Sequence, residues 1–263
     1  MERLAACIEY DGTRYSGWQR QGHVRNTVQE KLEHGLSVVA NESVSAQCAG
    51  RTDRGVHATM QIVHFDTHAK RTDRSWVLGT NTNIPHDISV RWVKHVSSEF
   101  HARFKAESRE YHYVINNGPL CNSALNRTRA TWDYRPLDEH RMQAAGNLLL
   151  GEHDFSSFRA AECQSKTPVK TINRLQLERR GQFILMVIEA NAFLHHMVRN
   201  IMGVLMSVGA GDKDIEWVRA VLEARDRRAG GVTAPANGLY LTRVNYPAKY
   251  DLPEQHSGII LLQ

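Results

Sequence analysis

The stretch CAGRTDRGVHA places a single carboxylate among basic and flexible neighbours. Asp53 lies between Arg51 and Arg54, and Gly50 and Gly55 bracket the charged group. Two neighbouring guanidinium groups favour the ionised form of a carboxyl group. An ionised carboxylate can act as a nucleophile or as a general base. The alternative is a surface turn, in which the acid caps the backbone and the arginines face solvent.

Signatures of other chemistries are missing from the sequence. It contains no G-x-x-x-x-G-K-[ST] loop, no G-x-S-x-G elbow and no H-E-x-x-H or H-x-E…P-C-x-x-C zinc motif. The GAGDKD segment follows a predicted helix and lacks a third glycine, so it indicates a helix end at Gly209. His195 and His196 are adjacent, and we expect them on different faces of a helix. We therefore predict neither a metal nor a cofactor.

The spacing of apolar residues predicts the elements that position these side chains. Thr27 followed by Glu30 is a capping box at the start of a helix. Alternating or β-rich runs predict strands at residues 3–10, 61–67, 88–96, 109–116 and 239–246, and a hairpin that turns near Arg180. Helical spacing predicts helices at residues 26–40, after Asp138, at 193–209 and at 215–224. Strands and helices in this order favour a mixed, mostly antiparallel α+β fold.

Composition bounds the class of protein. The chain has 263 residues, of which 41% are hydrophobic and 23% charged, values that suit a packed core. Its formal charge of +5 is compatible with a nucleic-acid partner and equally with a basic soluble protein. The four cysteines form no C-x-x-C pair, which favours reduced thiols in the cytosol. The N-terminus does not resemble a signal peptide, and no apolar run is long enough to span a membrane, so we expect a cytoplasmic protein.

Seven motifs in order resemble one known family. They are YDGTRYSGWQRQ, TVQEKLE, AGRTDRGVHATMQIVHF, FHARFKAESREYHY, LLGEHDFSSFR, AFLHHMVRNIMGVL and GLYL. Together they cover nearly the whole chain, and the chain resembles the tRNA pseudouridine synthase A family, bacterial enzymes that act on the anticodon stem-loop of tRNA. The resemblance implies the pseudouridine synthase fold, with two halves of similar architecture around a basic cleft. We expect an N-terminal domain at residues 1–104, carrying the Asp loop, and a C-terminal domain at 105–263.

The resemblance also implies roles for individual residues. Asp53 matches the catalytic aspartate, and Arg51 matches the arginine associated with flipping the target base. Tyr111 matches the tyrosine that stacks on the uracil, and Arg199 the basic residue that pairs with the catalytic carboxylate. Two segments match regions that touch tRNA: Phe100, His101, Ala102, Arg103 and Phe104, and then Ala161, Glu162, Cys163, Gln164 and Ser165.

Without the resemblance, each of these residues has an ordinary structural interpretation. Tyr111 could be a core tyrosine of a strand, and Arg199 a residue extending from a helix edge to solvent. Arg71 and other basic residues outside the pocket could bind the RNA backbone, or could be solvated surface charges.

The implied reaction isomerises uridines, at positions 38, 39 and 40 of tRNA, to pseudouridine. It breaks the bond from uracil N1 to the ribose, rotates the base and joins it through C5, so it consumes no cofactor. The carboxylate could attack C1′ or C6, or remove the proton from C2′, and the sequence leaves all three open. The family implies a homodimer. Two rival classes are a non-catalytic RNA-binding protein and another base-directed enzyme, such as a methyltransferase or a glycosylase.

Overall fold

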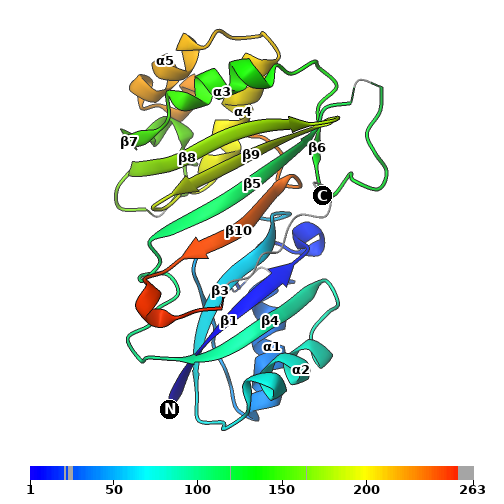
Figure 1. Cartoon of the computed structure of the whole chain (residues 1–263), viewed down its shortest axis with the longest axis vertical. Helices are drawn as coiled ribbons and strands as arrows, with labels where there is room; N and C mark the ends of the chain where they lie inside the picture. The colour runs from blue at the N-terminus through cyan, green and yellow to red at the C-terminus, as the bar shows by residue number, and fades with distance from the viewer. Residues whose placement is uncertain (21, 23–25, 119, 164, 254–263) are drawn as a thin grey trace. The chain divides into compact units, whose positions relative to one another are not determined.

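The computed structural model describes residues 1–20, 22, 26–118, 120–163 and 165–253. The chain forms two compact units. The first comprises Met1–Glu107 and the segment that begins at Tyr240, and the second comprises Ser108–Leu239. Figure 1 shows that each unit has a sheet with helices beside it.

The first unit is built on four long strands and a short one. These are β1 (Glu2–Tyr10), β2 (Gln47–Cys48), β3 (His57–Thr67), β4 (Ile88–Val96) and β10 (Leu239–Asn245). Their order is β4-β1-β3-β10, with β2 paired to β3. Strand β1 is antiparallel to both of its neighbours, whereas β10 runs parallel to β3, with Tyr240 opposite His57. The last strand of the chain therefore completes the first unit.

Two helices accompany this sheet, α1 (Val28–Ala40) and α2 (Asp73–Thr82), which pack on each other. Thr27 caps α1 as the capping box predicts, since its side chain accepts the N–H of Glu30. Leu32 and Leu36 of α1 are fully buried, so the helix turns one apolar face to the core. Helix α2 was not predicted. Only Trp76 and Thr80 of α2 are buried, which leaves too few apolar positions to give a periodic signal.

The second unit contains strands β5 (Ser108–Asn116), β6 (Thr131–Trp132), β7 (Gly151–Asp154), β8 (Val169–Arg180) and β9 (Phe183–Ala190). Their order is β5-β9-β8-β7, all antiparallel, with β6 parallel to β5. The predicted hairpin is confirmed: Arg180 pairs with Phe183, and Gly181 has a φ of 59°. Helices α3 (Glu139–Asn147), α4 (Met197–Gly209) and α5 (Glu216–Ala224) complete the unit, and α3 packs against α4 and β8.

Helix α4 ends at Gly209, as predicted, but it begins later than predicted. It begins at Met197, four residues after the predicted start, because His196 adopts a left-handed conformation with φ 62°. Gly209 is the last helical residue and not the left-handed stop, which is Gly211 with φ 79°. A Cβ on Gly209 would lie 2.7 Å from the Met142 sulfur of α3. The glycine therefore serves the close packing of two helices.

The fold class is confirmed as α+β, with mostly antiparallel strands flanked by five helices in the described residues. The expected domain boundary at 104/105 lies close to the observed one at 107/108, but the expected second domain ran to the end of the chain. The structure instead returns the chain to the first unit at Tyr240. Among the helices of the described part of the chain, none has the length and apolar character needed to cross a bilayer.

Candidate active site

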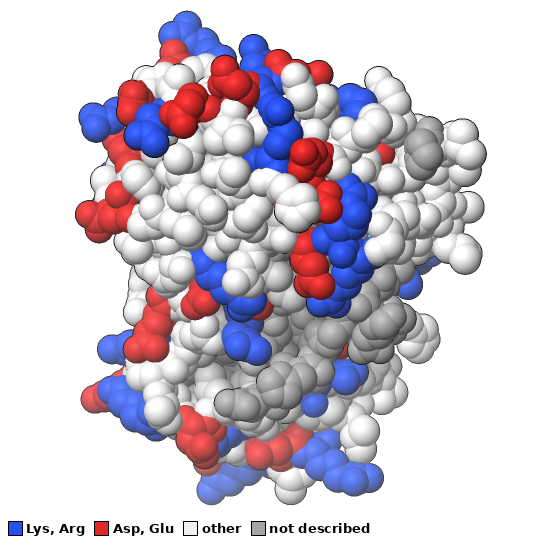
Figure 2. Space-filling view, turned by 45° about the horizontal axis from the view of Figure 1, so that its top comes forward, with Lys and Arg blue, Asp and Glu red and all other residues white. Residues whose placement is uncertain are grey.

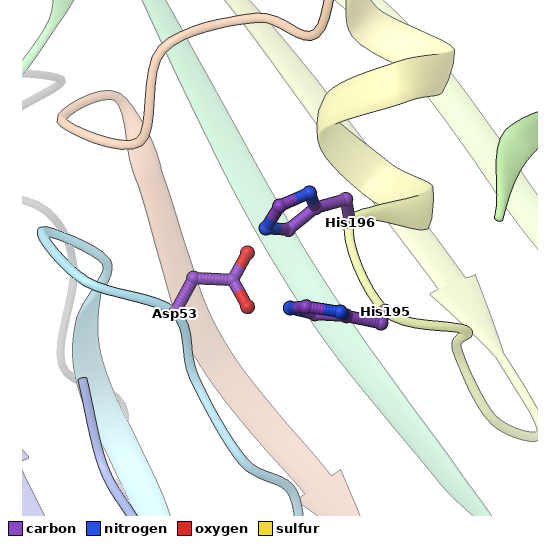
Figure 3. Close-up of side chains that lie close together, drawn as sticks. All are labelled: Asp53, His195 and His196. Carbon is purple, nitrogen blue, oxygen red and sulfur yellow. The ribbon is translucent and has the colours of Figure 1, made fainter. Parts of the chain in front are cut away.

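Asp53 lies in a short loop between β2 and β3, with its side chain half-buried (Figure 3). Arg51 and Arg54 on either side are exposed, whereas Thr52 between them is buried. Gly55 has a φ of 81°, so this glycine supplies a left-handed turn immediately before β3. The Thr52 side chain therefore points into the protein, whereas Arg51 and Arg54 lie at the surface.

The first motif of the chain, within its residues YDGTRYSGWQ, holds this loop in place. The hydroxyl groups of Tyr10 and Thr52 are hydrogen-bonded at 2.7 Å, and the N–H of Trp18 donates to the carbonyl of Thr52 at 3.0 Å. A Cβ on Gly12 would lie 1.9 Å from the carbonyl oxygen of Val56, so only glycine fits there. The loop is therefore fixed at its middle and at its end by residues some forty positions earlier.

Asp11 and His57 strengthen the same attachment, although the sequence analysis did not single them out. His57 Nδ1 lies 3.2 Å from an Asp11 carboxylate oxygen and 3.1 Å from the backbone nitrogen of Gly12. The His57 ring is buried and stacks on Tyr240 at a centroid distance of 4.7 Å. The hydrogen bond with His57, followed by those from Thr13, holds the pKa of Asp11 well below its usual range.

In the second unit, Tyr111 lies on β5 opposite Ile188 of β9. Its side chain is 7% exposed, and its ring meets that of Phe193 edge to face, with centroids 5.1 Å apart and an interplanar angle of 86°. Tyr113, two residues along, projects from the same face of the strand. Its hydroxyl donates to the carbonyl of Pro235 at 2.7 Å. These contacts therefore hold the Tyr111 and Tyr113 rings of β5 in fixed orientations.

Arg199 lies in the first turn of α4 and is half-buried. Its Nε–H donates to the carbonyl of Ala234 at 2.8 Å, and the Ala234 N–H donates to the Arg199 carbonyl at 3.1 Å. Burial raises the pKa of Tyr113, and the positive charge of Arg199 acts in the opposite direction. The guanidinium is therefore attached to the segment that precedes β10.

His195 and His196 immediately precede α4 (Figure 3). Their rings lie 4.1 Å apart, so the expectation that the two side chains point to different faces of a helix is wrong. The reason is the left-handed backbone of His196, which ends the regular spacing before the helix begins. Two imidazole rings supply two of the four ligands that a zinc ion usually takes, so the pair by itself is not a metal site.

The two segments expected to touch tRNA differ in exposure. Phe100 and Ala102 have no exposed surface and therefore anchor their turn, whereas Arg103 and Phe104 are exposed and His101 is half-buried. In the second segment, Ala161 and Glu162 are exposed, Cys163 and Ser165 are half-buried, and Gln164 lies outside the described residues. Arg71, between β3 and α2, is exposed, and its guanidinium donates to the carbonyl of Lys70.

Cys163 is attached to the residue that leads into α4. Its Sγ accepts the N–H of His195 at 3.3 Å, and the His195 carbonyl accepts the N–H of Ala160 at 3.0 Å. Burial acts to raise the pKa of Cys163, but the backbone hydrogen bonds from His195 and Ser165 and the charge of Arg159 outweigh it, so that the pKa is lowered. The segment around Cys163 is therefore fixed to the start of α4.

Lys and Arg side chains do not form a uniform patch on the face shown in Figure 2, where they alternate with Asp and Glu side chains. Some arginines are neutralised locally. Arg135 lies within 2.7 Å of carboxylate oxygens of both Asp133 and Asp212, and Arg179 lies 2.8 Å from Glu139. A polyanion is therefore expected to contact particular basic residues and not the whole of this face.

Comparison with known proteins identifies the family. The model of the tRNA pseudouridine synthase family matches residues 6–105 and 145–247. The chain belongs to this family. It is 55% identical to tRNA pseudouridine synthase A of Pseudomonas aeruginosa over 258 residues, which cover 98% of this chain and 90% of the relative. It is 52% identical to the protein of the same name from Coxiella burnetii over 262 residues, covering the whole of both chains.

A third relative of that name, from Klebsiella pneumoniae, is 54% identical over 260 residues, which cover 99% of this chain and 96% of the relative. The chain is thus a tRNA-modifying isomerase of the pseudouridine synthase family. The family resemblance expected from the seven motifs is confirmed. The matched ranges include the Asp53 loop, and also the segment of α4 that carries Arg199.

Proposed function

We propose that this chain converts uridines at positions 38, 39 and 40 of the tRNA anticodon stem-loop to pseudouridine, with Asp53 as the catalytic carboxylate. Membership of the tRNA pseudouridine synthase family gives the reaction. The observation that carries the assignment of Asp53 is the loop itself. It is fixed to Tyr10, Gly12 and Trp18, and it leaves Asp53 half-exposed beside an exposed arginine. A reactive group needs this combination of a rigid backbone and an accessible side chain.

Asp53 acts as a carboxylate on the ribose or on the base. It attacks C1′ or C6, or it removes the proton from C2′, and in each case the N1–C1′ bond breaks and a C5–C1′ bond forms. The C5 proton leaves once the new bond has formed, so its release reports the completed reaction. No electrons enter or leave, and no atom is added, so the reaction needs no cofactor.

Arg51 is proposed to take part in everting the uridine. Removing a base from its stack costs roughly a few kcal/mol, which contacts in the pocket and the filled gap must offset. An exposed arginine suits this role, since its planar cation can stack on bases and donate paired hydrogen bonds to phosphate. Tyr111 is proposed to stack on the everted uracil, and the edge-to-face contact with Phe193 keeps its ring in one orientation.

Arg199 is proposed as the basic partner of the Asp53 carboxylate. Its Nε–H is used by the carbonyl of Ala234, so pairing with a carboxylate would use the terminal guanidinium nitrogens. That attachment would aim the cation at the carboxylate. This pairing rests on the family resemblance, supported by the geometry of Arg199 within its own unit.

The remaining parts of the proposal concern partners and place. The tRNA contacts are proposed to involve His101, Arg103 and Phe104, with Phe100 and Ala102 as buried supports. The Cys163 segment and Arg71 are proposed as further contacts with the RNA backbone. We also propose a homodimer that acts in the cytoplasm, as the family resemblance implies.

The test is to incubate the purified chain with an unmodified tRNA transcript and then to map pseudouridines in the anticodon arm by carbodiimide labelling and reverse transcription. Stops one nucleotide 3′ of positions 38, 39 or 40 support the proposal, and stops only elsewhere in the tRNA refute the proposed positions. Mass spectrometry separates the rival classes. Isomerisation leaves the mass of the RNA unchanged, methylation raises it, and base excision lowers it.

A further inference from the structure

The turn at residues 100–104 presents one large aromatic side chain on a firmly anchored backbone. Phe104 is 72% exposed, whereas Phe100 is fully buried and packs against the rings of Tyr246 and Tyr250, each at 5.1 Å. The hydroxyl of Tyr246 donates to the carbonyl of Ala102 at 2.6 Å. Isolated exposed hydrophobic residues are ordinary on protein surfaces. The anchoring is what sets this one apart.

Three rings connect the core to the exposed position. The His64 ring, which is buried, lies 4.5 Å from the ring of His101, and the His101 ring lies 4.3 Å from that of Phe104 with an interplanar angle of 36°. His101 therefore lies beneath part of the Phe104 ring and supports it. The column gives Phe104 a defined position without burying it.

Backbone hydrogen bonds fix the two histidines in this column. His101 Nδ1 accepts the N–H groups of Arg103 at 3.2 Å and Phe104 at 3.3 Å, and His64 Nδ1 accepts the N–H of Ala102 at 3.2 Å. Each of these bonds requires an unprotonated nitrogen. Burial lowers the pKa of His64 to about 4 and also lowers the pKa of His101, so both rings are neutral at neutral pH.

A cation lies over the exposed ring. The Arg103 guanidinium carbon lies 5.6 Å from the Phe104 ring centroid, within the range of a cation–π contact, and the neighbouring Lys105 is exposed. A docking surface for an apolar protein partner would need contiguous apolar area, whereas the residues on both sides of Phe104 are cationic. A flat, exposed ring beside a cation suits an unpaired nucleotide, whose base stacks and whose phosphate pairs with the charge.

We propose that Phe104, supported by His101 and flanked by Arg103, is a stacking platform for one unpaired base of the tRNA substrate. This inference rests on the proposed function and adds to it a second base contact, separate from the uridine assigned to Tyr111. The platform acts in binding and not in the isomerisation itself. A preordered ring loses little conformational entropy when a base stacks on it, so the contact contributes to affinity.

The experiment measures binding and turnover separately in four variants. Phe104→Ala removes the ring, Phe104→Leu keeps apolar volume without a flat face, and Phe104→Trp keeps a flat face. Leu78→Ala is the matched control, because Leu78 is 54% exposed on α2 of the same unit. Fluorescence anisotropy gives the Kd for an unmodified tRNA in which cytidines replace the target uridines, so that no reaction occurs. Tritium release from tRNA labelled at uridine C5 gives kcat and KM.

Phe104→Ala and Phe104→Leu should raise Kd and KM by roughly 5- to 150-fold, the loss expected for one base–aromatic stack, with kcat unchanged. Phe104→Trp and Leu78→Ala should bind as the wild type does. Unchanged Kd in Phe104→Ala overturns the platform, as does equal loss in Leu78→Ala or a change confined to the oligomeric state in size-exclusion chromatography. If the wild type releases no tritium, the proposed function fails, and the binding data alone decide the platform.

Discussion

If Asp53 is the catalytic carboxylate, position 53 needs the negative charge of that group and not merely its shape. Asp53→Asn keeps the size of the side chain and removes the charge, so we expect isomerisation to fall by about 10⁴-fold or more, as on removal of other catalytic nucleophiles. The affinity for tRNA should stay close to that of the wild type, because the substitution leaves in place the contacts of Thr52 and Val56 with the first motif. Tritium release measures the turnover, and fluorescence anisotropy measures the affinity. Turnover at the wild-type rate removes Asp53 from the mechanism.

Arg51 and Arg54 form a natural pair for comparison, since both are exposed in the same loop. If Arg51 everts the uridine, Arg51→Ala should lower kcat by about 10²-fold, the loss that misplacement of a reacting group can cause, and should change the affinity less. Arg54→Ala should leave kcat near the wild-type value. Steady-state kinetics on tRNA measure both. A loss of affinity alone in Arg51→Ala contradicts the base-flipping role and leaves only a backbone contact.

The ring of Tyr111 and its hydroxyl can be separated by two substitutions. Tyr111→Phe keeps the stacking surface and the edge-to-face contact with Phe193, so tRNA binding should persist and any loss in kcat belongs to the hydroxyl. Tyr111→Ala removes the stacking contact, which is worth about 1–3 kcal/mol. It should therefore lower kcat/KM by more than Tyr111→Phe does. Kinetics of both variants, with thermal unfolding as a control for folding, provide the test. Equal kinetics of Tyr111→Ala and the wild type would refute the stacking role.

At the scale of elements, the N-terminal motif has a structural task that can be tested at Gly12. A Cβ there would lie 1.9 Å from the Val56 carbonyl oxygen, so Gly12→Ala must displace the end of the Asp53 loop. We expect a loss of stability of about 1–3 kcal/mol, typical of overpacking, and a larger relative loss of kcat than of tRNA affinity. Gly22→Ala is the control, since no atom of the described residues lies within 4 Å of a Cβ at Gly22.

Thermal unfolding and tritium release measure these two effects of Gly12→Ala. A stable, fully active Gly12→Ala variant contradicts the idea that the first motif positions the loop. The outcome bears on how motifs are interpreted. The YDGTRYSGWQ segment contributes a backbone surface against which the Asp53 loop is fixed, and the Tyr10 hydroxyl is hydrogen-bonded to that of Thr52 within the loop.

The elements most accessible to sequence reasoning are those with a strong local signal. The Thr27 cap, the hairpin at Gly181 and the apolar face of α1 follow from neighbours in sequence, and all three are confirmed. Helix α2 was not predicted, because its short buried face gives little periodicity in the sequence. The left-handed backbone of His196 was not predicted either, because only tertiary packing selects that conformation for a residue other than glycine.

The candidate site shows the same division. Asp53, Arg51, Tyr111 and Arg199 were identified through family motifs, and their roles stay predictions. The attachment of Asp11 to His57 was missed, because the two residues lie 46 positions apart and neither has an unusual neighbourhood in sequence. The sequence of the FHARF segment also does not show which of its residues are buried. In the structure Phe100 and Ala102 are buried supports, whereas Phe104 is exposed.

For the molecule as a whole, the division into units depends on one long-range pairing. Strand β10 pairs in parallel with β3, about 180 residues earlier in the chain, so the C-terminal segment belongs to the first unit. No local pattern encodes the partner of a strand, which is why the sequence predicted two consecutive domains. A consequence is that a fragment ending before Tyr240 lacks a strand of the first unit, including the ring that stacks on His57.

With a net charge of +5, part of the affinity for tRNA is electrostatic, and the salt dependence of binding reports how many phosphates are contacted. If Arg71 contacts the RNA backbone, Arg71→Ala should weaken binding to all tRNA sequences alike and reduce the slope of log Kd against log salt concentration by about one. Arg180→Ala is the control, because that guanidinium lies 3.0 Å from Glu178 and its charge is already compensated. Anisotropy titrations over a range of salt concentrations give both slopes. If the wild type and Arg71→Ala have the same slope, Arg71 is a solvated surface charge. If Arg71→Ala and Arg180→Ala reduce the slope equally, the slope depends on net charge and not on a contact of Arg71 with the RNA.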